Sequence, residues 1–376
     1  MKKVLIVATV YKFLSFERSD MEILKNLGYE IHVATNMQEA GWLQDDGSLD
    51  YLNIVKHQID FSRFPFSLQS YKAYRQLKCL MSSHNFNIIH CHTPVAAAIA
   101  RLAAMPFRNH GLKVIYTDHG FHFHKTSGMK SWLLYYPIEY LLSYFTDLII
   151  TINKEDLAVI KRFHSKEIQY IPGVGVDVNQ IAKLTPDTDS IRKRFNLPID
   201  AFTILSIGEL SARKNHEVVI RALAQIKECN IYYLICGTGT LRVYLQKIAF
   251  DLGIEDKVIF AGQVPHLDVL KISHAIEVGV IPSLIEGLGL AGIETLAAGK
   301  PLIGSNVHGI KDYVIDGVTG ISCNPKNIDE FKNALLKLYN DKYFYDRCAQ
   351  NCLSKALEFD IYRVKDIMLD VYSRYT

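Results

Sequence analysis

The sequence lacks the features that mark membrane-spanning, secreted and nucleic-acid-binding proteins. None of its apolar runs reaches the roughly 18 residues that a helix needs to span a bilayer. Its seven cysteines are odd in number and include no Cys-x-x-Cys pair, which favours reduced thiols in a cytosolic protein. The formal net charge of +3 is too small to indicate nucleic-acid binding. The apolar run at residues 4–10 has no cleavage site after it, so it predicts a buried β-strand and not a signal peptide.

Several catalytic motifs are also missing. The chain contains no nucleophile elbow, no P-loop and no His-Glu-x-x-His. Gly237-Thr238-Gly239-Thr240 resembles the start of a dinucleotide-binding fingerprint, but Arg242 replaces its third glycine. This favours a tight strand-to-helix turn and disfavours an NAD-dependent dehydrogenase. His-x-His pairs begin at His90 and His122, but no cysteine or carboxylate set completes either pair, so we expect no metal site.

What the sequence does contain is a repeated alternation of apolar strands and amphipathic helical stretches. This pattern is typical of parallel α/β sheets, and it restarts after a glycine-, proline- and polar-rich segment at residues 171–190. We therefore predict two doubly wound, Rossmann-like α/β domains facing a cleft, at residues 1–178 and 190–357, with a C-terminal helix at about 358–376 packing back on the first domain. The predicted strands are residues 4–8, 30–34, 88–90, 113–117, 148–152, 203–207, 231–236, 258–261, 278–281 and 301–304. Amphipathic helical segments, such as residues 16–27 and 68–82, are predicted between them.

The most informative stretch is residues 283–294. Glu286 and Glu294 are separated by seven residues that include three glycines. A glycine-rich turn lets backbone N–H groups approach an anion, and the helix that follows adds free N–H donors and the positive end of its dipole. Each carboxylate can accept two hydrogen bonds from vicinal sugar hydroxyls. The segment therefore predicts a nucleotide-sugar site; the alternative is a surface turn with two solvated glutamates.

A second strand–loop–helix predicts another anion site. Gly208 follows the strand at residues 203–207 and opens a loop that carries Arg213 and Lys214. Lys214 supplies a point charge for a phosphate, and Arg213 can hold two oxygens at once. The alternative is a solvated basic loop.

Two segments of the N-terminal half carry further candidates. Residues 116–124 follow a predicted strand and contain three histidines, one or more of which should line the cleft. Residues 61–78 interleave aromatic and basic side chains. A helix of that kind can rest on an anionic membrane, but an ordinary amphipathic helix with its aromatic residues in the core fits equally well.

Together these motifs resemble glycosyltransferase family 4, which has the GT-B fold, and the resemblance covers nearly the whole chain. In the C-terminal half it rests on Pro282-Ser283 before Glu286, the Glu-x7-Glu pair, Ala298-Gly299-Lys300-Pro301, Gly208 with Lys214, and Gly175-Val176-Asp177 at the hinge. The N-terminal half is similar to a narrower group, the bacterial capsule and exopolysaccharide transferases of the EpsD and CapM type. There the matching residues are Ile89-His90-Cys91-His92-Thr93-Pro94, His119-Gly120-Phe121-His122-Phe123, Tyr136-Pro137-Ile138-Glu139 and Thr151-Ile152-Asn153-Lys154-Glu155-Asp156.

The resemblance implies a role for each matching residue. Glu294 would accept hydrogen bonds from the ribose hydroxyls, and Glu286 would hold hydroxyls of the transferred sugar. Lys214 would neutralise the leaving phosphate, and His119 would touch the donor sugar. The residues implied in catalysis are Glu286, Lys214 and His119, and those implied in binding the nucleotide are Glu294, Arg213, Lys214, Gly208, Gly289, Leu290 and Ala291.

The chain departs from the family pattern at two places. Glu209 stands where the family usually has arginine, so Arg213 is the candidate to supply that charge. The family's early Gly-Gly loop is also absent, and Thr9-Val10-Tyr11-Lys12-Phe13 stands in its place.

The resemblance implies retaining transfer of a hexosyl or N-acetylhexosaminyl group from a UDP-sugar, with no metal and no cofactor. The implied acceptor is a polyprenyl-diphosphate-linked saccharide in capsule, exopolysaccharide or other surface-glycan synthesis. The implied location is the cytoplasm, with residues 61–78 meeting the inner face of the plasma membrane. The alternatives are a UDP-N-acetylglucosamine 2-epimerase of the same architecture and a non-catalytic saccharide-binding protein.

Overall fold

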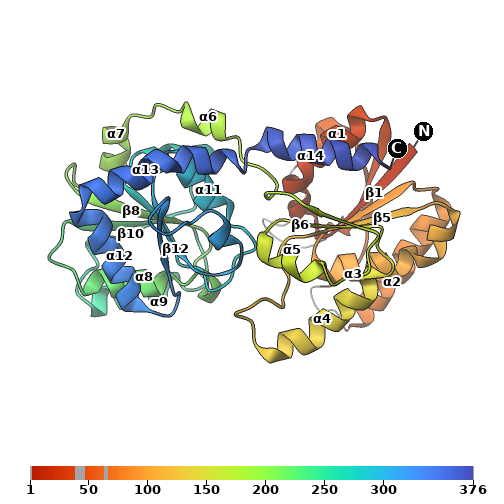
Figure 1. Cartoon of the computed structure of the whole chain (residues 1–376), viewed down its shortest axis with the longest axis horizontal. Coiled ribbons are helices and arrows are strands. Elements are labelled where there is room, and N and C mark those ends of the chain that lie inside the picture. The colour runs from red at the N-terminus through yellow and green to blue at the C-terminus, as the bar shows by residue number, and fades with distance from the viewer. Residues whose placement is uncertain (1, 39–46, 63–66, 376) are drawn as a thin grey trace. The chain divides into compact units, whose positions relative to one another are not determined.

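The computed structural model describes residues 2–38, 47–62 and 67–375, which form two compact units (Figure 1). The first unit comprises Met1–Gly175 and Tyr362–Thr376, and the second comprises Val176–Ile361. The second unit begins before residue 190, because it includes α6 (Val178–Ala182) and α7 (Thr188–Arg194). The polar stretch before residue 190 is therefore not a simple linker: Asp187 caps α7 by accepting a hydrogen bond from the Ser190 N–H.

The first unit is built on a parallel sheet of seven strands in the order β3-β2-β1-β4-β5-β6-β7. The chain reverses direction across the sheet between β1 and β4, which are neighbours in space. All five strands predicted in this half are present, whereas the two edge strands, β3 and β7, were not predicted. The strands are β1 (Lys2–Val10), β2 (Tyr29–Asn36), β3 (Val55–Gln58), β4 (Ile88–Cys91), β5 (Lys113–Asp118), β6 (Leu148–Thr151) and β7 (Glu167–Tyr170).

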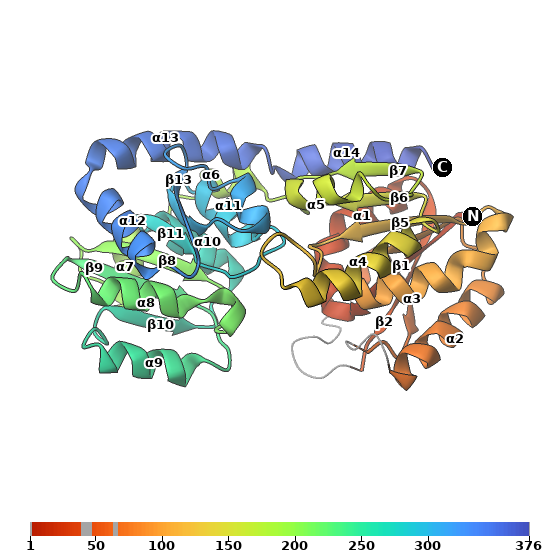
Figure 2. The same cartoon turned by 60° about the horizontal axis from the view of Figure 1, so that its bottom comes forward.

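Helices cover both faces of this sheet. On one face lie α1 (Arg18–Asn26) and α14 (Ile361–Ser373), and on the other lie α2 (Leu68–Ser83), α3 (Pro94–Ala104) and α4 (Met129–Ser143) (Figures 1 and 2). The predicted helix at residues 16–27 is divided, since a 3-10 helix at Tyr11–Glu17 precedes α1. This division places Glu17 at the end of the 3-10 helix that follows β1. The other helical segments of this unit are the 3-10 helices Asp50–Leu52 and Met105–His110, and α5 (Lys154–Ile160).

The second unit is built on a parallel sheet of six strands in the order β10-β9-β8-β11-β12-β13. Its central strands are short apolar runs that are buried over most of their length, as expected of parallel strands that are covered on both faces. The edge strand β13 was not predicted. The strands are β8 (Phe202–Ile207), β9 (Ile231–Cys236), β10 (Val258–Gly262), β11 (Val278–Ile281), β12 (Leu302–Ser305) and β13 (Gly320–Cys323).

The helices of the second unit also divide between two faces. Buried residues of α8 (His216–Ala224), α9 (Arg242–Asp251) and α12 (Ile328–Asn340) share one core with the sheet, and α10 (His266–His274) packs in a separate core. The neighbours β8 and β11 form the switch point of this sheet. In open parallel sheets, ligands bind at the carboxyl ends of the strands at such a point. The remaining helices are α11 (Leu290–Ala297), α13 (Lys342–Leu357) and the 3-10 helices Ala212–Lys214 and His308–Asp312.

Within the described part of the chain, no helix combines the length and the apolar character needed to cross a membrane.

Candidate functional site

The loop after β8 packs the Lys214 side chain against the backbone of Gly208. Gly208 has a φ of +147°, and a β-carbon there would come within 3.1 Å of Lys214 Cε. Asn215, in a left-handed conformation, donates its side-chain amide to Pro282 O at 3.0 Å, and the Leu284 N–H donates to Arg213 O at 2.8 Å. The loops after β8 and β11 are therefore fastened together at the switch point.

The Gly237-Thr238-Gly239 turn has a packing role in this arrangement. A β-carbon at Gly237 would lie 1.9 Å from Gly208 O, and one at Gly239 would lie 2.4 Å from Leu210 O. The Leu210 N–H donates to Thr238 O at 2.9 Å. Both glycines let the loop after β9 lie backbone to backbone against the loop after β8.

Glu286 is the point where the basic side chains converge. Its Oε2 accepts from Lys214 Nζ at 2.5 Å, from Arg213 Nη1 at 3.1 Å and from Ser283 Oγ at 3.2 Å. The side chains of Glu286 and Lys214 are only 13% and 16% exposed. Burial opposes ionisation of Glu286, but the charges of Lys214 and Arg213 outweigh it and hold the pKa of the Glu286 carboxyl below its ordinary value. The sequence assigned Lys214 to a phosphate and Glu286 to a sugar; in this structure the two side chains bind each other.

The turn between Glu286 and α11 is shaped by glycine and by a buried tyrosine. Gly289 precedes α11 with a φ of +86°, and a β-carbon there would lie 2.9 Å from Glu286 Cγ. Tyr313 Oη donates to Gly289 O at 3.2 Å. The first N–H groups of a helix have no partner within it, so the N–H groups of Leu290 and Ala291 at the start of α11 remain the predicted anion seat.

Glu294 lies one helical turn beyond Leu290 and is mostly buried, at 9% exposure. Its Oε1 is 2.7 Å from Nε2 of His266, the first residue of α10. The hydrogen bond with Glu294 raises the pKa of His266, and partial burial only partly opposes this shift. Sequence reasoning missed His266, because a single histidine after a proline carries no motif.

His119 follows β5 in the first unit, and the loop that carries it is held by carboxylates. Gly120, with a φ of +125°, donates its N–H to Asp118 Oδ2 at 3.1 Å, and the Phe121 N–H donates to Asp156 Oδ2 at 3.4 Å. Asn153 caps α5 by accepting from the Asp156 N–H. The Thr151–Asp156 motif thus supports the histidine loop.

The His119 imidazole belongs to a compact cluster of titratable groups. Its Nε2 lies 3.2 Å from His92 Nδ1 and 3.4 Å from Glu17 Oε1, and the Phe13 ring meets it edge-on with centroids 4.8 Å apart. Burial lowers the pKa of His119 to about 4. Burial also raises the pKa of Glu17 well above its ordinary value, and the nearby Asp20 adds to this shift.

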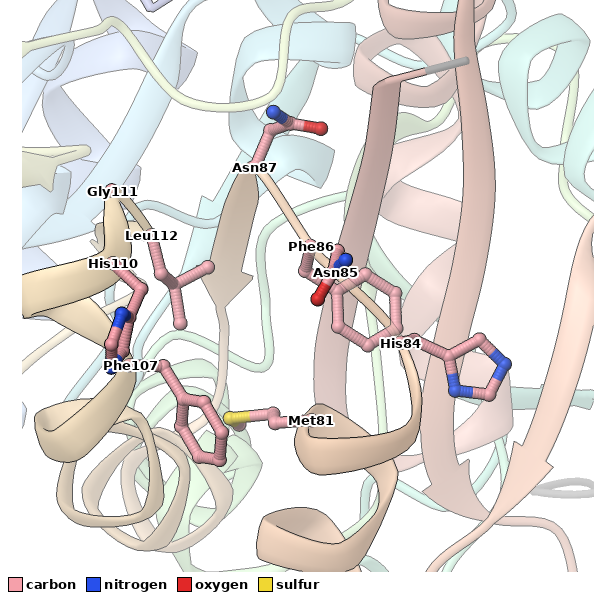
Figure 3. Close-up of a pocket in the computed structure, with 9 residues that line it drawn as sticks. All are labelled: Met81, His84, Asn85, Phe86, Asn87, Phe107, His110, Gly111 and Leu112. Atoms are coloured by element: carbon pink, nitrogen blue, oxygen red, sulfur yellow. The ribbon is translucent and has the colours of Figure 1, made fainter.

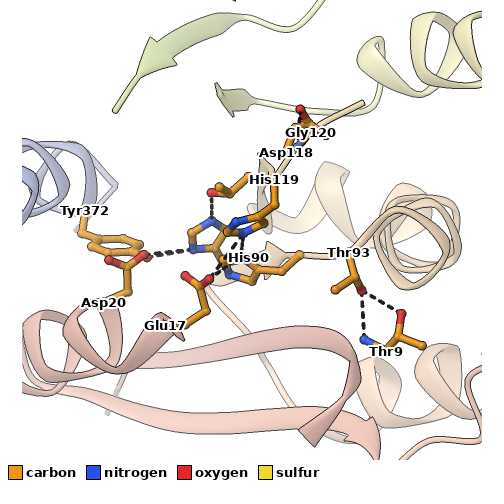
Figure 4. A network of polar contacts seen from close by, with 11 residues as sticks. Thr9, Glu17, Asp20, His90, Thr93, Asp118, His119, Gly120 and Tyr372 are labelled. Carbon is orange, nitrogen blue, oxygen red and sulfur yellow. Dashed lines mark hydrogen bonds and ion pairs between the residues drawn. The ribbon is translucent and has the colours of Figure 1, made fainter. Parts of the chain in front are cut away.

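A second layer of polar contacts backs this cluster (Figure 4). His90 Nδ1 lies 2.7 Å from Tyr372 Oη of α14, and His90 Nε2 lies 2.8 Å from Thr117 Oγ1. Tyr372 Oη donates to Asp20 Oδ2 at 2.7 Å. Burial lowers the pKa of His90 to about 3 and raises that of Asp20 to about 6, although the Tyr372 hydrogen bond opposes the latter shift. Sequence reasoning missed Asp20 and Tyr372, because they lie at opposite ends of the chain.

The Tyr136–Glu139 motif has a structural role. Glu139 on α4 accepts from Arg101 Nη2 on α3 at 2.7 Å, and both side chains are buried. The Arg101 guanidinium also lies over the Tyr116 ring, 4.1 Å from its centroid. This pair fastens α3 and α4 to each other and to β5.

The aromatic and basic side chains of residues 61–78 are divided between the core and the surface. Phe61 is buried, whereas Tyr71 on α2 is 63% exposed, and Lys72 beside it is ion-paired with Asp60 at 2.6 Å. Arg75 and Lys78 lie on the same exposed side of α2. Residues 63–66, which belong to this prediction, lie outside the described residues.

A surface pocket in the first unit lies at the other end of the parallel strands from the histidine cluster. It is lined by residues that precede β4 and β5, including Asn87 and Leu112 (Figure 3). It therefore lies at the amino ends of the parallel strands, whereas Glu17, His92 and His119 follow the carboxyl ends. Because of this position at the opposite end of the strands, the pocket is not part of the candidate site.

Family models match both halves of the chain. The model described as glycosyl transferases group 1 matches residues 187–354, and the model described as glycosyltransferase family 4 matches residues 22–180. Among solved structures, HepE of Anabaena in complex with UDP and glucose has a TM-score of 0.79 at 20% identity, with both chains covered completely. Sucrose-phosphate synthase from Thermosynechococcus elongatus has the same TM-score and identity, with 100% and 99% of the two chains covered.

Two relatives extend the match in sequence. EpsD of Bacillus subtilis (strain 168), provisionally named as a glycosyltransferase, is 35% identical over 380 residues, which cover 100% of this chain and 97% of EpsD. The UDP-Gal:alpha-D-GlcNAc-diphosphoundecaprenol alpha-1,3-galactosyltransferase of Escherichia coli is 29% identical over 315 residues, 81% of this chain and 80% of that protein. The chain therefore belongs to glycosyltransferase family 4 and has the GT-B fold of two parallel-sheet α/β domains.

Proposed function

We propose that this glycosyltransferase moves a hexosyl or N-acetylhexosaminyl group from a UDP-sugar to a polyprenyl-diphosphate-linked saccharide, with retention of the anomeric configuration. The observation that carries the donor part is the convergence of Lys214 and Arg213 on Glu286 beside the amino end of α11. The E. coli relative is named for a UDP-sugar donor and a diphosphoundecaprenol acceptor, which supports both halves of the proposal.

The donor would rearrange an ion cluster that already exists. Two cations share one carboxylate at Glu286, so the cluster carries a net positive charge that a diphosphate can compensate. A diphosphate on the N–H groups of Leu290 and Ala291 would draw the Lys214 ammonium away from Glu286. The freed Glu286 oxygen could then accept hydroxyls of the sugar, while Glu294 accepts those of the ribose.

The chemistry would take place on one face of the sugar. The bond between the anomeric carbon and the diphosphate oxygen breaks, and the bond to the acceptor oxygen forms on the same face. The leaving phosphate oxygen takes the acceptor proton, so no side-chain nucleophile is required. Lys214 and Arg213 would offset the charge that develops on the diphosphate, and domain closure about residues 173–177 would exclude water. We propose that His119 faces the donor sugar from the N-terminal domain.

A donor screen followed by product analysis tests this proposal. The purified full-length protein would be given UDP- and GDP-sugars and assayed for slow donor hydrolysis, then supplied with a synthetic polyprenyl-diphosphate saccharide. We expect consumption of a UDP-sugar and a product whose NMR coupling constants show the donor's anomeric configuration. An inverted product would refute retention. Formation of a new UDP-sugar without acceptor would indicate an epimerase, and glycan binding without donor consumption would indicate a binding protein.

The exposed side of α2 is proposed to meet an anionic membrane. Each basic residue near such a surface contributes about 1 kcal/mol to binding. Reversing the charge of Lys72, Arg75 and Lys78 together should therefore weaken binding to vesicles containing phosphatidylglycerol by at least about tenfold in a sedimentation assay. The matched control reverses Lys332, Lys337 and Lys342, which lie on α12 and α13, and leaves binding unchanged. Equal vesicle binding by wild type and the α2 variant would exclude this face.

A further inference from the structure

The side chain of Tyr313 packs against the turn at residues 286–290, which leads into α11 and is called the α11 turn below. Tyr313 is fully buried, and its Oη donates to Gly289 O at 3.2 Å. A β-carbon at Gly289 would lie 3.0 Å from Tyr313 Oη, and one at Gly292, inside α11, would lie 2.6 Å from both Oη and Cε2 of the same ring. Glycine is unfavourable inside a helix. Its presence at residue 292 is explained by the space that the tyrosine ring occupies.

The Tyr313 hydroxyl is held in place as a hydrogen-bond donor. Thr319 Oγ1 donates to Tyr313 O at 2.7 Å, which fixes the backbone that carries the ring. Burial raises the pKa of the Tyr313 hydroxyl well above its ordinary value, and the charges of Glu286 and Asp312 add to this shift. The hydroxyl therefore stays protonated and keeps its hydrogen bond to Gly289.

The Tyr313 ring also contacts Phe359, which lies between α13 and α14. The two ring centroids are 6.0 Å apart and the ring planes are nearly perpendicular, at 87°. Edge-to-face aromatic pairs at this distance are favourable. Phe359 is 2% exposed, so its ring has little freedom to move independently of Tyr313. One tyrosine thus connects the α11 turn with Phe359.

Phe359 belongs to the segment through which the chain passes between the two units. The chain leaves the first unit after Gly175 and returns to it after Ile361. Phe359 O accepts from the Val176 N–H at 3.0 Å, and the Ile361 N–H donates to Val176 O at 3.0 Å. The two passages are therefore hydrogen-bonded to each other; residues 176 and 359–361 are called the paired crossing below. A change in the arrangement of the units must be taken up at or beside this paired crossing.

We propose that Tyr313 is a positioning residue that couples the α11 turn to the paired crossing. This inference rests on the proposed binding of a UDP-sugar at the start of α11. A diphosphate bound there draws on the backbone at Gly289, the Tyr313 hydroxyl follows the carbonyl that it binds, and the closely packed ring passes the shift to Phe359. Because such coupling is reciprocal, the conformation of the paired crossing changes the affinity for the nucleotide by the same factor.

Two substitutions each remove one end of this connection. Tyr313→Phe removes the hydrogen bond to Gly289 and keeps the ring contact with Phe359, whereas Phe359→Leu keeps the hydrogen bond and removes the ring contact. Calorimetric titration of the full-length protein with UDP would measure both. We expect Tyr313→Phe to weaken UDP binding about three- to tenfold, the usual effect of losing one hydrogen bond. Phe359→Leu should weaken it at least about threefold, because Tyr313 is then less firmly held against the turn.

Tyr345→Phe is the matched control. It removes another tyrosine hydroxyl of the second unit that donates to a backbone carbonyl, Glu277 O, at 3.0 Å. Glu277 precedes β11 and lies at the opposite end of that strand from the α11 turn. Tyr345→Phe should therefore bind UDP as wild type does. Melting temperatures of all three variants would show whether each is folded.

Hydrogen–deuterium exchange provides a readout that a merely structural role would not move. In wild type and in Tyr345→Phe, UDP should slow amide exchange in the peptides that contain Val176 and Ile361, because the bound turn restrains the paired crossing. This protection should be lost in Tyr313→Phe at saturating UDP. Wild-type protection in Tyr313→Phe would overturn the coupling, as would wild-type UDP affinity of Phe359→Leu. Failure of wild type to bind UDP would refute the proposed donor site and this coupling with it, whereas the other two outcomes refute the coupling alone.

Discussion

Lys214→Ala should lower kcat for transfer by about 100- to 1000-fold, the usual effect of removing one donor that stabilises charge in a transition state. Lys214 is 16% exposed and its ammonium lies 2.5 Å from Glu286. A cation in such a poorly solvated position interacts strongly with a diphosphate whose charge increases as the sugar bond breaks. The Arg213 guanidinium is 45% exposed, so Arg213→Ala should have a smaller effect.

Steady-state kinetics with the donor identified by the screen would measure this effect. Lys227→Ala removes an exposed lysine near the end of α8 and should leave both kcat and KM unchanged. Turnover of Lys214→Ala or of Glu286→Ala equal to that of wild type would remove these residues from the catalytic site. Melting temperatures of all variants would show whether each is folded.

The pH profile of Lys214→Ala provides an independent check. In wild type, Lys214 and Arg213 hold the pKa of the buried Glu286 carboxyl below its ordinary value, so the carboxylate stays charged well below neutral pH. Without Lys214, burial of Glu286 is opposed by Arg213 alone and the pKa of Glu286 rises. The acidic limb of the activity profile should therefore move to higher pH in Lys214→Ala. A purely structural role of Lys214 would not move this limb.

The fold could be predicted largely from apolar runs, and the strands that escaped prediction share one property. In a parallel sheet the inner strands are covered on both faces, so β4, β6 and β11 are continuous buried apolar runs or nearly so. The unpredicted strands β3, β7 and β13 all lie at sheet edges. Edge strands tolerate polar residues, so Val55-Lys56-His57-Gln58 and Glu167-Ile168-Gln169-Tyr170 carry no strand signal.

The two parts of the candidate site differ in how much the sequence reveals. Gly208, Lys214 and Glu286 lie in short loops directly after strands, so parallel pairing of β8 and β11 brings them together without further information. Predicting the cluster of Glu17, His92 and His119 would require the conformations of three separate loops. It would also require the residue at which α1 begins. Glu17 was predicted inside an α-helix, whereas the break between the 3-10 helix and α1 turns its carboxylate toward the two histidines.

Gly309→Ala is expected to have the second large effect, and it acts through the Glu286 turn without removing a charge. Gly309, in the 3-10 helix His308–Asp312, donates its N–H to Glu286 O at 3.3 Å. A β-carbon there would lie 2.0 Å from Gly287 O and 2.8 Å from Leu288 Cα. These contacts are with backbone, so the turn between Glu286 and α11 must move. Overpacking of this kind costs about 1–3 kcal/mol.

That displacement should appear in donor binding as well as in stability. The turn positions both the Glu286 carboxylate and the N–H groups at the start of α11, so a shift should weaken UDP binding by about tenfold or more, since tenfold corresponds to about 1.4 kcal/mol. Calorimetric titration with UDP and thermal unfolding would measure the two effects. Gly128→Ala is the matched control, because Gly128 has a φ of −67° and a β-carbon there would meet nothing within 4 Å. If Gly309→Ala lowers the melting temperature but leaves UDP affinity unchanged, the turn supports the fold and another segment must bind the diphosphate.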